Sequence, residues 1–193
     1  MRVAPAAATS DAEAVRASLT APDRFEELFA RHAPAIFRYV AARVGASAAE
    51  DIVAETFTTA FRRRAKFDLA AANARPWLYG IAANRLHKHR DAEQRWLERQ
   101  LLDRPERQRD DGAGIDDRLD AARLAPQLAA ALLTLSVGER DVLLLFALED
   151  FSGDEIAAAL GIRPGTARSR LSRGRAQLRA LLEHHLNEGD HHD

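Results

Sequence analysis

The chain has 193 residues, with 28 Lys and Arg against 29 Asp and Glu, and its formal net charge at pH 7 is -1. It contains no cysteine, which excludes disulfides, Cys-ligated zinc, iron–sulfur clusters and a thiol nucleophile. Its 47% hydrophobic and 30% charged residues are typical of a globular protein, and no run approaches the ~20 apolar residues that span a bilayer. We therefore expect a folded cytoplasmic protein without a membrane segment.

The first half of the chain predicts three helices. Residues 1–22 are rich in alanine and end in Pro22, which favours a disordered leader. A helix is expected from Arg24 to Val44, because its apolar residues recur at steps of three and four. Ser47 to Glu50 has capping-box spacing and predicts the start of a second helix, which ends in the basic run 62–66. A loop from Phe67 to Arg75 then leads to Pro76, a favoured first residue for a third helix.

The second half begins after a charged segment with Pro and Gly, residues 101–117, which predicts a flexible linker. An Ala- and Leu-rich helix follows, and capping boxes start at Ser136 and Ser152. The short helix after Ser152 ends at Gly161, and an Arg-rich helix begins near Thr166. The sequence therefore predicts an all-α fold with two small helical domains, residues 23–100 and 118–184, and a tail at 185–193. The C-terminal domain has helix–turn–helix form.

Basic residues gather in two segments. Residues 62–95 carry nine basic and three acidic side chains, and residues 161–182 carry six arginines and no acid, whereas residues 139–155 carry six acids and one arginine. This pattern predicts two separate surfaces that face a polyanion. In the last helix Ala167, Leu171 and Leu178 form an apolar seam, so the arginines and serines off that seam are expected to contact DNA in the major groove.

Two motifs together resemble bacterial sigma factors of the extracytoplasmic-function (ECF) type. Residues 148–157 (LEDFSGDEIA), 165–171 (GTARSRL) and 173–175 (RGR) resemble the fourth region of that family. Residues 50–57 (EDIVAETF) and 76–84 (PWLYGIAAN) are similar to its second region. Helix–turn–helix patterns occur in many regulators, but both motifs in this order, separated by a charged linker, are specific.

The resemblance implies partners and site residues. It implies binding to core RNA polymerase through Asp51 and Glu55, and an anti-sigma factor as a further partner. It also implies promoter DNA binding at two elements, with no cofactor and no metal. The minus-10 element would be recognised and melted by Lys66, Phe67, Arg75, Trp77, Asn84, Arg85 and Lys88, where Trp77 is either a core residue or a DNA contact. The minus-35 element would be read by Thr166, Arg168, Ser169, Ser172, Arg173 and Arg175.

Other classes of function remain as alternatives. A stand-alone helix–turn–helix regulator explains the C-terminal domain but has no need of Asp51, Glu55 or the Trp77 helix. A structural DNA-binding adaptor would show weak sequence preference and a steep salt dependence. An enzyme is not expected, because the sequence has no phosphate-binding Gly-rich loop and no nucleophile elbow. The net charge of -1 predicts weak DNA binding by the isolated protein.

Overall fold

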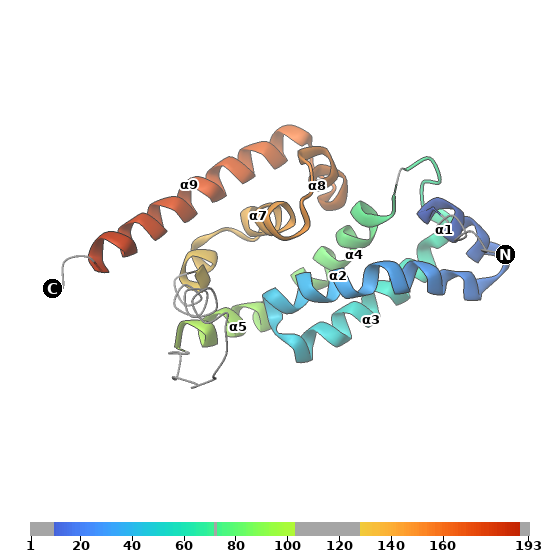
Figure 1. Cartoon of the computed structure of the whole chain (residues 1–193), viewed down its shortest axis with the longest axis horizontal. Coiled ribbons are helices and arrows are strands. Elements are labelled where there is room, and N and C mark those ends of the chain that lie inside the picture. The colour runs from blue at the N-terminus through green and yellow to red at the C-terminus, as the bar shows by residue number, and fades with distance from the viewer. Residues whose placement is uncertain (1–9, 72, 103–127, 190–193) are drawn as a thin grey trace, which may run out of the picture.

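The computed structural model describes residues 10–71, 73–102 and 128–189, and within the last helix it describes side chains as far as Leu181. Regular structure in these residues is helical, as predicted (Figure 1), and none of their helices is long and apolar enough to cross a membrane. Most of the predicted linker lies outside the described residues. The elements are α1 (Asp11–Thr20), the 3-10 helix η1 (Pro22–Phe25), α2 (Glu26–Val44), α3 (Ala46–Arg63), the 3-10 helix η2 (Arg64–Lys66), α4 (Arg75–Lys88), α5 (Arg90–Leu102), a helical segment at 128–134, α7 (Val137–Glu149), α8 (Gly153–Leu160) and α9 (Pro164–Gly189).

Helices α2 and α3 form a hairpin with one residue between them, and they lie side by side in Figure 1. That residue is Gly45, whose φ of +81° favours glycine. A Cβ added to Gly45 would also lie 2.9 Å from a ring carbon of Trp96 in α5. The turn therefore needs glycine both for its backbone angle and for the close packing of the indole.

One apolar core runs from the N-terminal helices into the C-terminal ones. Leu28 and Ile52 of the α2–α3 hairpin are fully buried in the same cluster as Leu145 of α7 and Ile156 of α8. Helices α4 and α8 touch through their backbones, because a Cβ added to Gly80 would overlap the carbonyl oxygen of Ala159. The two predicted domains are therefore packed against each other, and helix α9 extends from this body (Figure 1).

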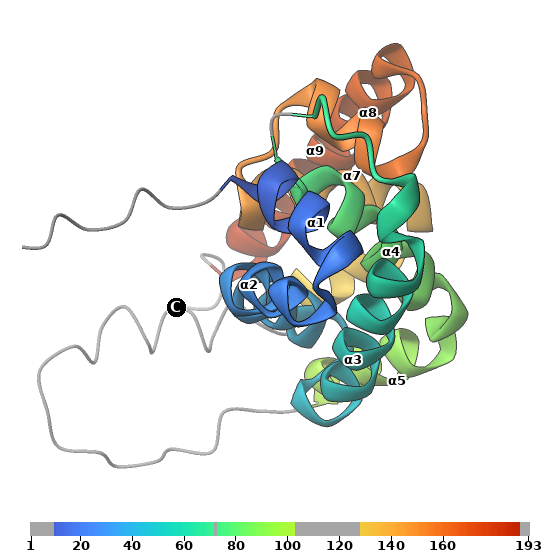
Figure 2. The same ribbon diagram turned by 90° about the vertical axis from the view of Figure 1, so that its right-hand side faces the viewer.

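The prediction of a disordered leader is wrong for the part of residues 1–22 that the structure describes. Residues 11–20 form α1, which begins with a capping box between Ser10 and Glu13. Its side chains Ala14 and Val15 are fully buried, so the helix is part of the fold. Figure 2 shows α1 in front, close to α2 and α4. Residues 1–9 lie outside the described residues.

Two further boundaries differ from the sequence prediction. The capping box at Ser47 is wrong, because α3 already begins at Ala46 and Gly45 makes no side-chain cap. The tail predicted from residue 185 is wrong for residues 185–189, which continue α9, and residues 190–193 lie outside the described residues. The helix–turn–helix and the capping boxes at Ser136 and Ser152 are confirmed.

Candidate nucleic-acid interface

The helix–turn–helix consists of α8 and α9. The Ser152 hydroxyl accepts a hydrogen bond from the backbone N–H of Glu155 (3.3 Å), and the Glu155 carboxylate accepts one from the Ser152 N–H (2.9 Å). Gly161 ends α8 in the left-handed region with φ +62°, and the N–H of Ile162 bonds to the carbonyl of Ala157 (3.0 Å). These local bonds set the direction in which α9 leaves the turn.

The exposed side of α9 carries the predicted minus-35 residues. Ala167 is 2% exposed and turns into the core, as the predicted seam requires. The side chains of Arg168, Ser169 and Ser172 are exposed on the opposite side. Thr166 is half-buried, and its carbonyl accepts a hydrogen bond from the Ser169 hydroxyl (3.1 Å). This side of α9 therefore presents charged and hydroxyl groups to solvent.

Two arginines at the margin of this surface contact α7. The Nε of Arg173 lies 2.8 Å from Oε1 of Glu139, although Arg173 keeps 61% of its side chain exposed. The guanidinium of Arg175 lies 4.1 Å from the centroid of the Phe146 ring. The hydrogen bonds from Ser136 and then from Arg173 hold the pKa of Glu139 below its ordinary value. Both arginines are thus oriented by α7 before any ligand binds.

The aromatic residues of the predicted minus-10 site belong to the core. Phe67, predicted to contact the minus-10 element, is only 8% exposed in this arrangement. Its ring packs on that of Trp77 with 5.1 Å between centroids, and Trp77 is partly buried against the same core. Lys66, directly before Phe67, is exposed.

Arg75 is held by the corner between α7 and α8. Its Nη2 donates to the carbonyl of Glu149 (2.7 Å) and lies 3.6 Å from the carboxylate of that residue. Its guanidinium also lies 4.7 Å from the centroid of the Phe151 ring. The Tyr79 hydroxyl donates a hydrogen bond to the same carboxylate. A predicted minus-10 residue is therefore bound by the C-terminal module.

The remaining residues predicted to bind the minus-10 element follow one another along α4. Asn84 is exposed and donates from its amide to the carbonyl of Gly80 (2.8 Å), and Lys88 is exposed near the helix end. Arg85 donates to the Thr59 hydroxyl (2.5 Å) and pairs with Glu55 of α3 at 3.2 Å. The predicted polymerase-binding and minus-10 residues thus meet at this ion pair.

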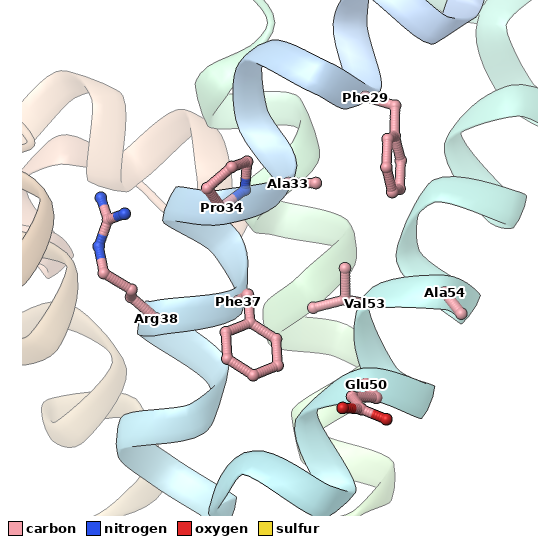
Figure 3. Close-up of a pocket in the computed structure, with 8 residues that line it drawn as sticks. All are labelled: Phe29, Ala33, Pro34, Phe37, Arg38, Glu50, Val53 and Ala54. Carbon is pink, nitrogen blue, oxygen red and sulfur yellow. The ribbon is translucent and has the colours of Figure 1, made fainter.

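A groove that the sequence analysis missed lies between α2 and α3 (Figure 3). Its volume is about 560 Å³, and Phe29 on its wall is 46% exposed. The exposed carboxylates Asp51 and Glu55 lie one turn apart on α3, the helix that also provides Glu50 to the groove. The spacing of apolar residues along α2 was the available signal. The lining residues are Phe29, Ala33, Pro34, Phe37, Arg38, Glu50, Val53 and Ala54.

Two family models match the chain, Sigma-70 region 2 over residues 28–96 and Sigma-70, region 4 over residues 126–178. RNA polymerase sigma factor CarQ of Myxococcus xanthus is 37% identical over 172 residues, which cover 84% of this chain and 91% of CarQ. ECF RNA polymerase sigma factor SigE of Mycolicibacterium smegmatis is 31% identical over 166 residues, covering 85% of this chain and 63% of SigE. The chain is an ECF sigma factor of the sigma-70 family.

A solved structure has the same arrangement of helices as this sigma factor. It is CnrH in complex with the cytosolic domain of CnrY, which matches with a TM-score of 0.65 and 27% identity over 90% of this chain and 97% of CnrH. RNA polymerase sigma factor CnrH of Cupriavidus metallidurans is also a sequence relative, with 31% identity over 171 residues. The sigma factor directs RNA polymerase to promoters for initiation. A stand-alone regulator is not favoured, because region 2 matches as well as region 4.

In this sigma factor regions 2 and 4 meet at a buried ion cluster. Arg43 of α2 is 1% exposed, and its Nε donates to Glu93 of α5 (2.6 Å) while its Nη1 donates to Asp141 of α7 (2.6 Å). Arg140 pairs with Glu93 at 3.1 Å, and Nε2 of His87 lies 2.6 Å from Asp141. Four helices of the two regions thus contribute to one ionic contact.

Burial and charge act in opposite directions on this cluster. Burial raises the pKa of Asp141, but the hydrogen bond with His87 and the charge of Arg43 bring it below the ordinary value. The same hydrogen bond raises the pKa of His87. Burial, above all, raises the pKa of Tyr39 to about 12, so its hydroxyl stays protonated beside Arg43. Asp141 is therefore a stable anion between the guanidinium and the imidazole.

Proposed function

We propose that this sigma factor divides promoter recognition between its two regions. Region 4 reads the minus-35 element with the exposed side of α9, and region 2 reads and melts the minus-10 element with the segment 66–75 and helix α4. The single observation that supports the division best is the exposed side of α9, where Arg168, Ser169 and Ser172 stand opposite the buried Ala167. A guanidinium can bind guanine edges with two hydrogen bonds, and the serine hydroxyls add less selective contacts.

Run-off transcription with core polymerase tests the minus-35 assignment. Arg168→Ala and Arg173→Ala each lower transcription from a cognate promoter by a factor equivalent to about 1–3 kcal/mol if each contact is bidentate to a base. Arg179→Ala, further along the same helix, is the matched control. An equal loss on promoters with altered minus-35 sequences identifies a phosphate contact and contradicts base reading. No promoter-dependent product with the wild-type protein contradicts the function as a whole.

Core polymerase binds the α2–α3 side of region 2 in this proposal. Asp51 and Glu55 offer two carboxylates to a basic partner surface, and the apolar groove beside them accepts aliphatic or aromatic side chains. Because Glu55 also pairs with Arg85, Asp51→Arg is the cleaner variant. We expect Asp51→Arg to abolish co-elution with core polymerase and to leave thermal stability unchanged. Asp154→Arg on α8 is the control, and unchanged co-elution of Asp51→Arg contradicts the assignment.

The two regions must separate before all of the minus-10 residues reach DNA. Arg75 is bound to Glu149 and stacked on Phe151, so these contacts break when Arg75 binds a phosphate or a base. The relative CnrH is solved with the cytosolic domain of CnrY. We infer that this chain likewise binds an anti-sigma factor, which holds the regions together, whereas core polymerase holds them apart.

The proposed action is binding and strand separation in the cytoplasm, with no catalytic step by the chain itself. The net charge of -1 supports this division of labour with polymerase, because a domain that binds DNA tightly alone is usually basic. We expect weak promoter binding by the isolated chain at physiological salt. Tight, sequence-specific binding without polymerase contradicts this and favours a stand-alone regulator.

A further inference from the structure

A buried carboxylate at the start of α1 gathers contacts from two distant parts of the chain. Asp11 is 5% exposed, and its Oδ2 lies 2.9 Å from Nε2 of His32 in α2. The same oxygen accepts a hydrogen bond from the backbone N–H of Ala74 (2.8 Å), and Arg31 pairs with the other carboxylate oxygen. Burial by itself raises the pKa of Asp11, but the bonds from His32 and Ala74 hold it well below its ordinary value. Asp11 is thus a buried anion, and both of its carboxylate oxygens have partners within the protein.

The contact with Ala74 fixes the end of the segment that precedes α4. Ala74 is fully buried and is the cap residue of α4, where its carbonyl accepts from the N–H of Leu78 (2.9 Å). The segment between η2 and α4 therefore ends at a residue whose position is set by Asp11. Arg75, a predicted minus-10 residue, follows directly.

Helix α1 also holds the other end of the same segment. Nε of Arg64 in η2 donates to the carbonyl of Ser18 in α1 (3.3 Å), and Nη1 of Arg64 donates to the carbonyl of Phe61 (2.7 Å). Lys66 and the buried Phe67 follow immediately. Two contacts from one ten-residue helix, at Asp11 and at Ser18, thus lie at the two ends of the segment 66–74.

We propose that α1 fixes both ends of the proposed minus-10 segment, residues 66–74, and that Asp11 is the positioning residue. The inference rests on the proposed role of the segment 66–75 in binding the minus-10 element. A segment whose ends are fixed loses less conformational entropy when it binds an unstacked single strand, so the fixed ends increase affinity without touching the DNA. Asp11 acts through the N–H of Ala74 and leaves polymerase binding and minus-35 reading to other surfaces.

The test uses holoenzyme, made from core polymerase and the full chain. The probe is a fluorescent single strand that carries the minus-10 region of a promoter selected in vitro by the wild-type holoenzyme. We expect Asp11→Ala to weaken binding of this strand about tenfold, because the N–H of Ala74 loses its charged acceptor. Asp11→Asn keeps an oxygen that accepts from Ala74, and its loss is smaller, about threefold. Arg16→Ala, an exposed position on the same helix, is the matched control.

Two further readouts separate positioning from a general loss of structure. Co-elution with core polymerase and affinity for a minus-35 duplex stay at wild-type levels for both Asp11 variants if the proposal holds. A parallel loss in these readouts shows a general structural role and overturns it. Lys66→Ala tests the segment itself. If Lys66→Ala weakens strand binding while Asp11→Asn and Asp11→Ala do not, only the proposed role of α1 and Asp11 is wrong. If Lys66→Ala has no effect, the proposed role of the segment fails first. Asp11→Asn is nearly isosteric and keeps the test decisive if Asp11→Ala does not fold.

Discussion

Replacing Arg43 by methionine tests whether the ion cluster holds regions 2 and 4 together. Arg43 is 1% exposed and neutralises Glu93 and Asp141, which come from α5 and α7. Methionine fills much of the same space but carries no charge. In Arg43→Met, Glu93 keeps Arg140 and Asp141 keeps only His87. With His87 neutral, the buried cluster changes from net zero to one negative charge.

The expected cost follows from that unbalanced charge. Removing one partner from a buried ion pair costs about 3–5 kcal/mol, because the remaining charge stays away from water. In a chain of this size each kcal/mol lowers the melting temperature by about 2–4 °C, so Arg43→Met should lower it by about 6–20 °C. The loss should be smaller below the pKa of His87, where the protonated imidazole restores neutrality.

Thermal unfolding followed by circular dichroism measures this effect. Arg63→Met, at the exposed end of α3, removes the same charge from the surface and should change stability by less than about 0.5 kcal/mol. Asp141→Asn combined with Arg43→Met should recover part of the loss, since the unpaired charge is then gone. A melting temperature for Arg43→Met within 2 °C or so of the Arg63→Met control would refute the reasoning.

Three more predictions concern single contacts. Ser152→Ala removes the α8 cap and should cost about 1 kcal/mol in urea unfolding; a smaller loss than that of an exposed Ser169→Ala contradicts the role of the cap. Gly80→Ala should push α4 from α8, cost about 1–3 kcal/mol and increase the radius of gyration in solution scattering, whereas Gly153→Ala, with open space around it, should do neither. The raised pKa of His87 stabilises the fold fully below the unfolded value of about 6.5, and this contribution is lost as the pH rises through the folded value. His87→Gln should therefore flatten the pH dependence of the melting temperature in that window, and an unchanged slope contradicts it.

Local patterns predicted the helix–turn–helix because its signals lie within a few residues. Ser152 and Glu155 form their capping box within one turn, and the period of α9 places Ala167 inside and Arg168 outside. The same spacing exists at Ser10 and Glu13, and it was the available signal for α1. The surrounding alanine-rich sequence resembles a disordered leader. The burial of α1, which makes it part of the fold, depends on residues far along the chain.

Aromatic residues near a loop are harder to assign from the sequence. Trp77 could be a core residue or a DNA contact from the sequence alone, and its packing on the buried Phe67 is a tertiary contact that no local pattern indicates. The bond from Ala74 to Asp11 likewise joins residues 63 positions apart, and neither residue has a local pattern that indicates it. The contacts that shape the predicted minus-10 segment are therefore tertiary, whereas those of α9 are local.

The ionic character of the contact between regions 2 and 4 also escaped prediction, and it has a physical consequence. Arg43, Glu93 and Asp141 each resemble a solvated helix residue, and they become buried only because three helices meet. Water cannot bind apolar side chains that separate, but it solvates each carboxylate and guanidinium of this cluster as soon as the regions part. An ionic contact consequently opens at a lower cost than an apolar one of equal area, while its geometry still selects one closed arrangement. Separation of the two regions as proposed would also break the contact of Arg75 with Glu149, so the cluster would couple exposure of this predicted minus-10 residue to that separation.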